Sequence, residues 1–451
     1  MMVLLVNPPA LSMYSTFGLS MPPMGLLYVA AALEQSGHVV TVCDLTVDGS
    51  GLEDQQIASA DIVGISSDTT RIDRALKLAS RVKAAGKQVV MGGPHPQFLA
   101  EDILCRGAVD FIVKGEGEAV FPALLKVLQE GKSLETVPGL IFYRNGSVID
   151  TGDAIRLDVE QIPLPARHLL ELSPYQAVVC GRPAASLVSS RGCPGACHFC
   201  SSSSFFGRGW RARSAESVLA EIDLLYNRYG YRAIAFMDDN FTLDPRRVDQ
   251  ICDGIIQRGY DLKWWNFSRV DTIVRNPSMV SKMAAAGSTM VYLGIESDNV
   301  DTLNSLGKRS STAEVEQAVE ILKSNGIETY GSYIIGNLNE KAADVHRTVE
   351  MAIRLDTNIA QFSILTPYPG TVLYQQLKDK IFTRKWKFFD GLHLVFRHPG
   401  INRHHLQYLL IMAFIRFYRR SVQATKGFQQ ASSRVSLSFR KLAVCAWELI
   451  F

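Results

Sequence analysis

The stretch that most constrains this chain is Arg191-Gly192-Cys193-Pro194-Gly195-Ala196-Cys197-His198-Phe199-Cys200, with three cysteines at the spacing C-x3-C-x2-C. It follows a short apolar run at residues 185–188, which is typical of a buried strand. Structural zinc sites use four protein ligands, whereas a 4Fe-4S cluster takes one thiolate on each iron. Three cysteines therefore predict a four-iron cluster with one iron open to a small molecule. Two alternatives remain: a zinc knuckle with His198 as fourth ligand, or three unrelated buried cysteines.

The pattern resembles the signature of the radical S-adenosylmethionine (SAM) superfamily. The match includes the aromatic Phe199 directly before the last cysteine. The resemblance implies that Cys193, Cys197 and Cys200 bind a 4Fe-4S cluster, that SAM occupies the open iron, and that Phe199 lies beside these cofactors. It also implies an electron donor of the flavodoxin or ferredoxin type.

Length and composition predict an enzyme of several domains in a reducing compartment. A chain of 451 residues is too long for one ordinary core, so two or three domains are expected. Its eight cysteines form only one cluster, which argues against a disulfide framework. The first six residues have no basic flank and are typical of a buried strand rather than a signal peptide. No apolar run is long enough to span a bilayer, so we expect a cytoplasmic protein.

Residues 1–138 predict a doubly wound, Rossmann-like α/β domain, because short apolar runs alternate with helix-like stretches. Pro22-Pro23 begin the first helix and Gly37 follows its end. Ligands of such sheets bind beyond the carboxyl ends of the strands. We expect parallel strands at residues 3–6, 39–43, 62–65, 88–91 and 111–113.

Four small-residue loops follow these strands. Any one of them is ordinary turn chemistry, but four in succession let the backbone approach a large flat ligand. Lying upstream of the cysteines, they resemble the cobalamin-binding domain of the cobalamin-dependent radical SAM enzymes. The cofactor-binding residues that this implies are Asn7 and Pro8 in the first loop, Ser66 and Asp68 in the second, Gly92, Gly93, Pro94 and His95 in the third, and Gly115, Glu116 and Gly117 in the fourth.

The motif D-x-H-x-x-G, which supplies an axial histidine in many cobalamin proteins, is absent. No aspartate within residues 1–150 has a histidine two positions further on. By resemblance to the radical SAM branch, the cobalt should be held without a histidine below it, in the base-off state. His95 is the one histidine in these loops, and we expect it to serve packing or hydrogen bonding rather than ligation.

Residues 139–180 predict a linker that holds a small hairpin turning at Asn145-Gly146. Residues 181–380 predict six βα units, which form a partial barrel open on one side. Catalytic groups of such barrels lie at the carboxyl ends of the strands. The six strands are expected at residues 185–188, 233–237, 264–268, 291–296, 329–335 and 361–365.

Polar or glycine residues stand at each strand end of this partial barrel. A lone carboxylate there is usually a helix cap, but a whole rim of such groups favours a site. The resemblance implies that Asp238 and Asp239 bind the methionine amino group of SAM and that Glu296 meets the ribose hydroxyls. Ser268, Arg269 and Gly336 extend the rim. The fifth strand ends in Gly336-Asn337-Leu338-Asn339-Glu340, which lacks the proline and glycine of the family's G-x-P-G-E, so its adenine contact stays open.

The combined resemblance implies a cobalamin-dependent radical SAM methyltransferase. A 5'-deoxyadenosyl radical would activate an unactivated carbon, and methylcobalamin would supply the methyl group. An oxidative cyclase or oxidoreductase of the same architecture, without methyl transfer, is the alternative. A methylthiotransferase would need three further cysteines near the N-terminus, where only Cys43 and Cys105 occur. A cobalamin sensor or carrier would leave the cysteine cluster without purpose. No residue is assigned to catalysis itself.

Residues 381–451 predict a basic, mainly helical C-terminal region. From residue 382 to the end there are 12 Lys and Arg against 2 Asp and Glu. We expect a helix near residues 406–420 to close the open side of the barrel. The alternative is peripheral contact with an anionic membrane, which would suit a lipid or isoprenoid-like substrate. Trp386, Phe388, Phe389, His393 and Phe396 would then line the entrance. The expected partner is otherwise a small-molecule substrate, with no nucleic acid.

Overall fold

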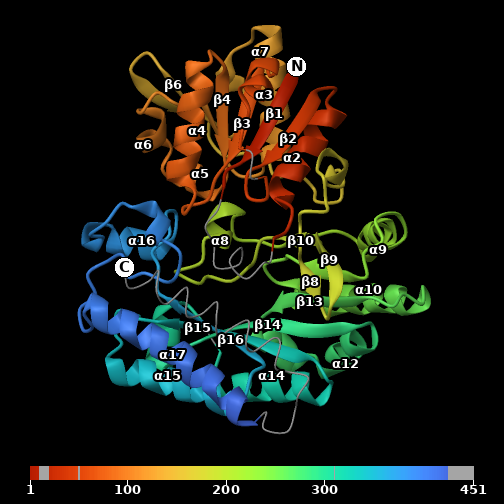
Figure 1. Cartoon of the computed structure of the whole chain (residues 1–451), viewed down its shortest axis with the longest axis vertical. Helices are drawn as coiled ribbons and strands as arrows, with labels where there is room; N and C mark the ends of the chain where they lie inside the picture. The colour runs from red at the N-terminus through yellow and green to blue at the C-terminus, as the bar shows by residue number, and fades with distance from the viewer. Residues whose placement is uncertain (10–19, 49–50, 309, 425–451) are drawn as a thin grey trace.

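The computed structural model describes residues 1–9, 20–48, 51–308 and 310–424. Figure 1 shows two α/β parts stacked along the long axis, with α8 (Ser202–Phe205) and β10 (Ser190–Arg191) between them. The last described helix, α17 (Arg403–Ala424), lies against the second part. The doubly wound domain, the partial barrel and the helical C-terminal region are therefore confirmed as the fold.

The first sheet has seven strands in the order β2-β1-β3-β4-β5-β6-β7. The first five in this order are parallel, as expected, and β6 and β7 join the edge in antiparallel fashion. The hairpin thus extends this sheet and is not part of a linker, which corrects the sequence interpretation. The strands are β1 (Met2–Asn7), β2 (Val39–Asp44), β3 (Ile62–Ser66), β4 (Gln88–Gly92), β5 (Phe111–Val113), β6 (Leu140–Arg144) and β7 (Ser147–Asp150).

Helices cover both faces of the first sheet. Along β1, Val3 and Leu5 belong to one apolar core while Leu4 and Val6 belong to the other, because successive side chains of a strand point to opposite faces. This double burial explains why the strands are continuous apolar runs in the sequence. The helices of this part are α2 (Met24–Gln35), α3 (Asp54–Ser59), α4 (Ile72–Ala84), α5 (Pro94–Phe98), α6 (Ala100–Leu104), α7 (Gly117–Glu130) and the short η1 (Leu134–Thr136).

The second sheet has the order β16-β15-β14-β13-β12-β9-β8. Its six longer strands are parallel, which confirms the six predicted strands, and the short β8 is antiparallel at the edge. The strands are β8 (Val178–Val179), β9 (Arg182–Leu187), β12 (Ala233–Phe236), β13 (Lys263–Ser268), β14 (Ser288–Glu296), β15 (Glu328–Ile335) and β16 (Ile359–Ile364). A separate ribbon of β10 and β11 (Arg211–Ala212) encloses the cysteine loop.

The helices of the second part follow its strands in the βα pattern. Ser214 caps α9 by accepting from the amide of Ser217, and Ser311 forms the predicted capping box of α14. The helices are α9 (Ala215–Asp223), α10 (Pro245–Gln257), α11 (Val270–Arg275), α12 (Pro277–Ala285), α13 (Val300–Ser305), α14 (Thr312–Ser324), α15 (Ala342–Leu355) and α16 (Val372–Leu377). Short helical turns are η2 (Arg167–Leu169), η3 (Leu224–Arg228), η4 (Phe241–Leu243), η5 (Lys378–Lys380) and η6 (Trp386–Phe388).

The apolar face of α17 is packed on the protein. Leu406, Leu410 and Phe417 are buried against β16 and α15, and the Tyr418 hydroxyl donates to the Ala360 carbonyl at 3.0 Å. This helix thus covers the last strand, as we expected, and these three apolar side chains are buried in the protein. In the described part of the chain no helix is long and apolar enough to cross a membrane. The Arg420 side chain and residues 425–451 lie outside the described residues.

The segment after the barrel also packs on the first domain. Trp386, Phe389 and Phe396 are buried, so these three aromatic residues form core and not a substrate entrance. Trp386 meets the ring of His95 edge-on, with 4.7 Å between centroids. Gly370 lies so close to α5 that a Cβ atom there would be 2.4 Å from the Phe98 ring. The two parts therefore hold each other through buried aromatic packing.

Candidate functional site

One cavity of about 330 Å³ lies between the carboxyl ends of the first sheet and the start of the cysteine loop. Its walls come from both parts of the molecule: the small-residue loops of the first domain on one side, and the ends of β9 and β12 on the other. Seven of the predicted cobalamin-binding residues line it, namely Ser66, Gly92, Gly93, Pro94, Gly115, Glu116 and Gly117. The barrel contributes Val188, Ser190, Arg191, Met237 and Asp239.

Glycines give this cavity its shape. Besides the four predicted ones, Gly25 at the start of α2 and Gly64 in β3 belong to its walls. A Cβ atom on Gly25 would meet nothing within 4 Å, so the backbone there is open to a ligand. A Cβ on Gly93 would lie 2.4 Å from the Ser67 carbonyl oxygen, so the loops after β3 and β4 contact each other through backbone atoms. Such walls fit a large flat ligand that lies against the main chain.

Four of the predicted cobalamin-binding residues, Asn7, Pro8, Asp68 and His95, do not line the cavity in the described structure. The Asn7 amide donates to Asp44 at 2.7 Å and its oxygen accepts from Arg71 at 2.8 Å. Asp68 accepts from the Thr70 amide and pairs with Arg71 at 2.9 Å. Pro8 is buried. These side chains, and that of His95, are therefore occupied by local structure.

His95 is a packing residue, as expected. It is buried, and its Nδ1 lies 3.2 Å from the Thr69 hydroxyl. Burial, together with the charge of Arg106, lowers the pKa of His95 to about 3. A histidine with this environment has a partner on one nitrogen and an aromatic ring against it, so it is not poised as a ligand.

We expect His95 to make the fold acid-sensitive. The unfolded chain accepts a proton on this ring below about pH 6.5 and the folded chain does not, so stability is full above that pH and falls toward pH 3. The loss is at most about 1.4 kcal/mol per pH unit. Between pH 7 and pH 4.5, the denaturant midpoint should fall less steeply for His95→Phe than for the wild type. Cobalamin bound to His95→Phe should have the same absorption spectrum as cobalamin bound to the wild type. Parallel pH curves would contradict this role.

The cysteine loop is held from two sides. The His198 amide donates to the Leu306 carbonyl at 3.0 Å, and the Leu373 amide donates to the His198 carbonyl at 2.9 Å. His198, considered above as a zinc ligand, directs Nδ1 to the Ser305 carbonyl at 2.9 Å. A Cβ on Gly307 would lie 2.6 Å from the Ala196 carbonyl oxygen, so the segment after α13 needs glycine to pack on this loop.

The three thiols share one half-buried region. A Cβ atom placed on Gly195 would lie 3.3 Å from the sulfur of Cys193 and 3.9 Å from the sulfur of Cys197. Burial raises the pKa of the Cys200 thiol to about 11. Among the described residues, no three Cys, His, Asp or Glu side chains converge closely enough for a single metal ion. In a four-iron cube each thiolate binds its own iron, and three neighbouring cysteines supply the thiolates for three of the four irons, so this donor set fits a cluster.

The two aspartates after β12 have different positions. Asp238 is 1% exposed and accepts from the Ser189 amide at 2.6 Å and the Ser190 hydroxyl at 2.9 Å, so it anchors the chain before the cysteines. Asp239 lines the cavity and accepts from the Gly192 amide at 3.2 Å. Burial raises the pKa of Asp239. Asp239 is therefore the one of the pair that can face a ligand.

Two cations, one of them missed from the sequence, flank the cysteine loop. The Arg269 guanidinium pairs with Asp271 at 2.9 Å and lies 3.1 Å from a Cβ position on Gly195. Half-buried Lys308 pairs with Glu296 at 2.8 Å and donates to the Gly294 carbonyl at 2.9 Å. No periodic or motif signal in the sequence pointed to Lys308, which lies in the loop after α13.

Glu296 follows a bulge at the end of β14 and has φ of 71°. That is a rare conformation for a residue with a side chain, and such strain is common at ligand sites. Ser268 is buried and accepts from Asn266 at 2.7 Å. Gly336 has φ of 75°, and a Cβ there would lie 2.5 Å from Leu406 of α17. The structure thus gives Gly336 a packing role beneath α17.

A buried ionic network joins the cavity to the cysteine loop. Arg191 is 3.0 Å from Glu116 and 2.6 Å from Glu118, and it lies over the Tyr28 ring at 5.0 Å. Arg211 pairs with Glu116 at 2.7 Å. Burial alone would raise the pKa of Glu116, but the two arginines outweigh it and hold that pKa below its usual range. Only Glu116 was predicted as a site residue, because the pairing spans distant segments.

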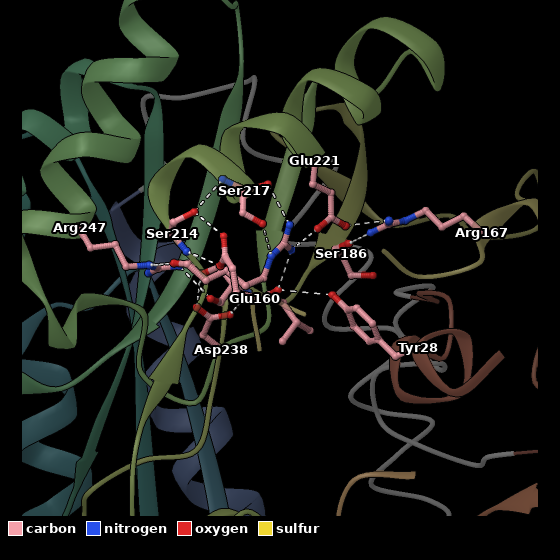
Figure 2. A network of polar contacts seen from close by, with 12 residues as sticks. Tyr28, Glu160, Arg167, Ser186, Ser214, Ser217, Glu221, Asp238 and Arg247 are labelled. Carbon is pink, nitrogen blue, oxygen red and sulfur yellow. Dashed lines mark hydrogen bonds and ion pairs between the residues drawn. The ribbon is translucent and has the colours of Figure 1, made fainter. Parts of the chain in front are cut away.

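A second buried network fixes the segment 186–190 that leads into the cysteine loop (Figure 2). Glu221 is fully buried between two arginines, with Arg167 at 2.8 Å and Arg213 on its other oxygen. Three arginines each donate to a carbonyl of the segment: Arg167 to Ser186 at 2.7 Å, Arg213 to Val188 at 3.3 Å and Arg247 to Ser189 at 2.9 Å. The course of the chain before Cys193 is therefore set by buried charge.

Two α/β parts that share one cavity, one of them bearing a three-cysteine loop, define an enzyme built around two adjoining cofactor sites. The chain matches the family model of the B12 binding domain over residues 12–125 and that of the radical SAM superfamily over residues 187–352. It belongs to the cobalamin-dependent, B12-binding radical SAM enzymes. The family's cofactors are cobalamin, SAM and a 4Fe-4S cluster, and the glycine walls and the cysteine loop fit them.

The chain is similar in sequence to proteins named as methyltransferases and to one named as a cyclase. An uncharacterized methyltransferase of Pyrococcus horikoshii is 35% identical over 430 residues, 93% of each chain. The hopanoid C-3 methylase of Methylococcus capsulatus is 29% identical over 88% of this chain and 76% of its own. The anaerobic magnesium-protoporphyrin IX monomethyl ester cyclase of Rubrivivax gelatinosus is 27% identical over 93% of this chain and 77% of its own.

The fold also agrees with a solved structure. The radical SAM methyltransferase TsrM from Kitasatospora setae, solved with cobalamin and a 4Fe-4S cluster bound, aligns with a TM-score of 0.69 at 20% identity. The alignment covers 84% of this chain and 74% of that chain. At this identity the likeness supports the architecture of the two parts.

Proposed function

We propose that this chain is a cobalamin-dependent radical SAM methyltransferase that places a methyl group on an unactivated carbon of a small-molecule substrate. The observation that carries the proposal is the shared cavity. Glycine walls of the first domain face Asp239 and Arg191 of the barrel, and Asp239 is hydrogen-bonded to Gly192, next to Cys193. A cofactor bound by the glycine loops would thus lie beside a cofactor bound at the cysteine loop.

The cofactors, when bound, supply radical formation and the methyl group, while the protein supplies binding and orientation. Cys193, Cys197 and Cys200 would hold the cluster. Asp239 and Glu296 would bind polar groups of SAM from the strand ends. Apolar side chains of the cavity, including Val188, Met237 and Phe206, would exclude water from the reacting carbon.

An oxidative cyclase is the second candidate. The similarity to the anaerobic magnesium-protoporphyrin IX monomethyl ester cyclase extends over 93% of this chain, which keeps a ring-closing reaction as the alternative. The identity to the two methylating relatives, at 35% and 29%, favours methyl transfer. The hopanoid C-3 methylase also makes apolar substrates the first class to try.

The test uses anaerobically reconstituted protein with cobalamin, a reductant and SAM labelled in its methyl group. Candidate extracts, including a lipid fraction, are incubated and analysed by mass spectrometry. We expect 5'-deoxyadenosine together with a product that is heavier by the labelled methyl, and neither with Cys197→Ala. An unlabelled, dehydrogenated or ring-closed product would support the cyclase. No 5'-deoxyadenosine under any condition would support a cobalamin carrier.

A further inference from the structure

An exposed aromatic residue surrounded by cations lies just after α16. Phe382 is 42% exposed, and the Arg403 guanidinium lies 5.7 Å from its ring centre. The segments around Ile381 and Phe396 pair in antiparallel fashion, and the Arg397 amide donates to the Lys380 carbonyl at 2.9 Å, so these two exposed cations lie opposite each other on neighbouring segments. Exposed Lys378 precedes them. We call the group Lys378, Lys380, Phe382, Arg397 and Arg403 the Phe382 patch.

The positive charge of this patch is not neutralised within the described structure. Residues 378–403 contain seven Lys and Arg against two acids, Asp379 and Asp390. Asp390 is engaged by His393 at 2.9 Å. None of the patch cations is found in an ion pair in the part of the chain that the structure describes, whereas Arg384, between the two segments of the patch in sequence, pairs with Asp102 at 3.9 Å. A concentrated positive surface attracts and orients an acidic partner.

Helix α16 connects the patch to the cysteine loop. Its second residue, Leu373, donates its amide to the His198 carbonyl at 2.9 Å, and its last residue directly precedes Lys378. A helix of this length spans about 9 Å. The patch therefore begins about one short helix away from the main chain that carries Cys197 and Cys200.

We propose that the Phe382 patch is the docking surface for an acidic one-electron donor protein of the flavodoxin or ferredoxin class. This rests on the proposed function, because the cluster must gain one electron before SAM is cleaved. In that step the donor loses one electron, the cluster gains it, and no atom is transferred. Electron-transfer complexes use small, charge-guided interfaces, and an aromatic residue at the centre of such a surface suits protein contact.

An anionic membrane would also attract cations, but the observations favour a protein. Membrane-bound helices bury a continuous apolar face in the lipid, whereas the apolar face of α17 is packed on β16 and α15. The patch offers one exposed ring rather than such a face. Its position next to the helix that contacts the cysteine loop is what an electron donor requires.

The test compares two variants that lose the same charge. The patch variant carries Lys378→Gln, Lys380→Gln and Arg397→Gln, and the control carries Lys77→Gln, Lys126→Gln and Lys323→Gln at exposed sites elsewhere. Cluster reduction by a pre-reduced acidic flavodoxin is followed by stopped-flow absorbance at low and high salt. We expect the patch variant to be slower by about tenfold at low salt, with a flatter salt dependence. The control should match the wild type.

Dithionite, which needs no docking surface, should reduce all three proteins at equal rates. Equal flavodoxin rates for the patch variant and the wild type would overturn the proposal, and so would a patch variant that dithionite also reduces slowly. Binding to phosphatidylserine vesicles that is lost in the patch variant, with an unchanged flavodoxin rate, would assign the patch to a membrane. The readout is cluster reduction, so a failure of methyl transfer would be seen separately in the products.

Discussion

Replacing Cys193, Cys197 or Cys200 with alanine is expected to remove most of the bound iron and sulfide and to abolish SAM cleavage. Two thiolates leave two irons of the cube without a protein ligand, so the cluster is open to solvent and oxygen. The three thiols share one half-buried region beside Arg269 and Lys308. Iron and sulfide assays after anaerobic reconstitution, with detection of 5'-deoxyadenosine, measure the effect.

Cys252 provides the matched control for these variants. It is fully buried among the apolar side chains of α10, away from the cysteine loop. Cys252→Ala should keep its iron and its SAM cleavage and lose only packing stability. The cluster assignment would be wrong if a variant lacking all three loop cysteines still bound about four irons.

Replacing Arg191 with leucine is expected to cost about 3–5 kcal/mol of unfolding free energy, because it leaves buried carboxylates without their partner. Glu118 pairs with Arg191 at 2.6 Å, while Glu116 keeps Arg211. The second substitution Glu118→Leu, made together with Arg191→Leu, should recover part of the loss, since it removes the stranded charge. Denaturant midpoints of the wild type, both single variants and the double variant give the coupling.

In the double variant, Glu118→Leu could instead lower the unfolding free energy by as much as it does alone in the wild type. That result would contradict the pairing. The network would then contribute additively and would not be a paired unit. Cobalamin retention on gel filtration gives an independent readout. Arg191 and both glutamates line the cavity, so Arg191→Leu should retain less cobalamin than the wild type.

Much of the fold could be predicted because its signals are local. The parallel strands are buried on both faces, so each is a short apolar run, and the loops at their carboxyl ends must meet at one edge. The cysteine spacing is likewise contained in one loop. The strand that pairs with the hairpin is distant in sequence, because helix α7 lies between β5 and β6. The turn at Asn145-Gly146 predicts the hairpin but does not indicate that it pairs with β5.

The side-chain partners at the strand ends could not be predicted. Asn7 and Asp68 stand where a ligand contact is expected, but Arg71, the residue directly before α4, engages both. Lys308 reaches Glu296 from the loop after α13, and a lysine in a loop is ordinary in any sequence. Whether a polar side chain contacts a ligand or a neighbouring residue depends on the packing of segments that are distant in sequence. The spacing of residues along the chain does not predict that packing.

The cavity of the first domain and the cysteine loop should form one site. Electron paramagnetic resonance of anaerobic protein loaded with cob(II)alamin tests it most directly, with the cluster first oxidised and then reduced. Asp239 lines the cavity and is hydrogen-bonded next to Cys193, so the two paramagnetic centres should be near neighbours. We predict that reduction of the cluster broadens or splits the cobalt signal, and that Cys197→Ala abolishes this change. An identical, unbroadened cobalt spectrum in both states would contradict the account.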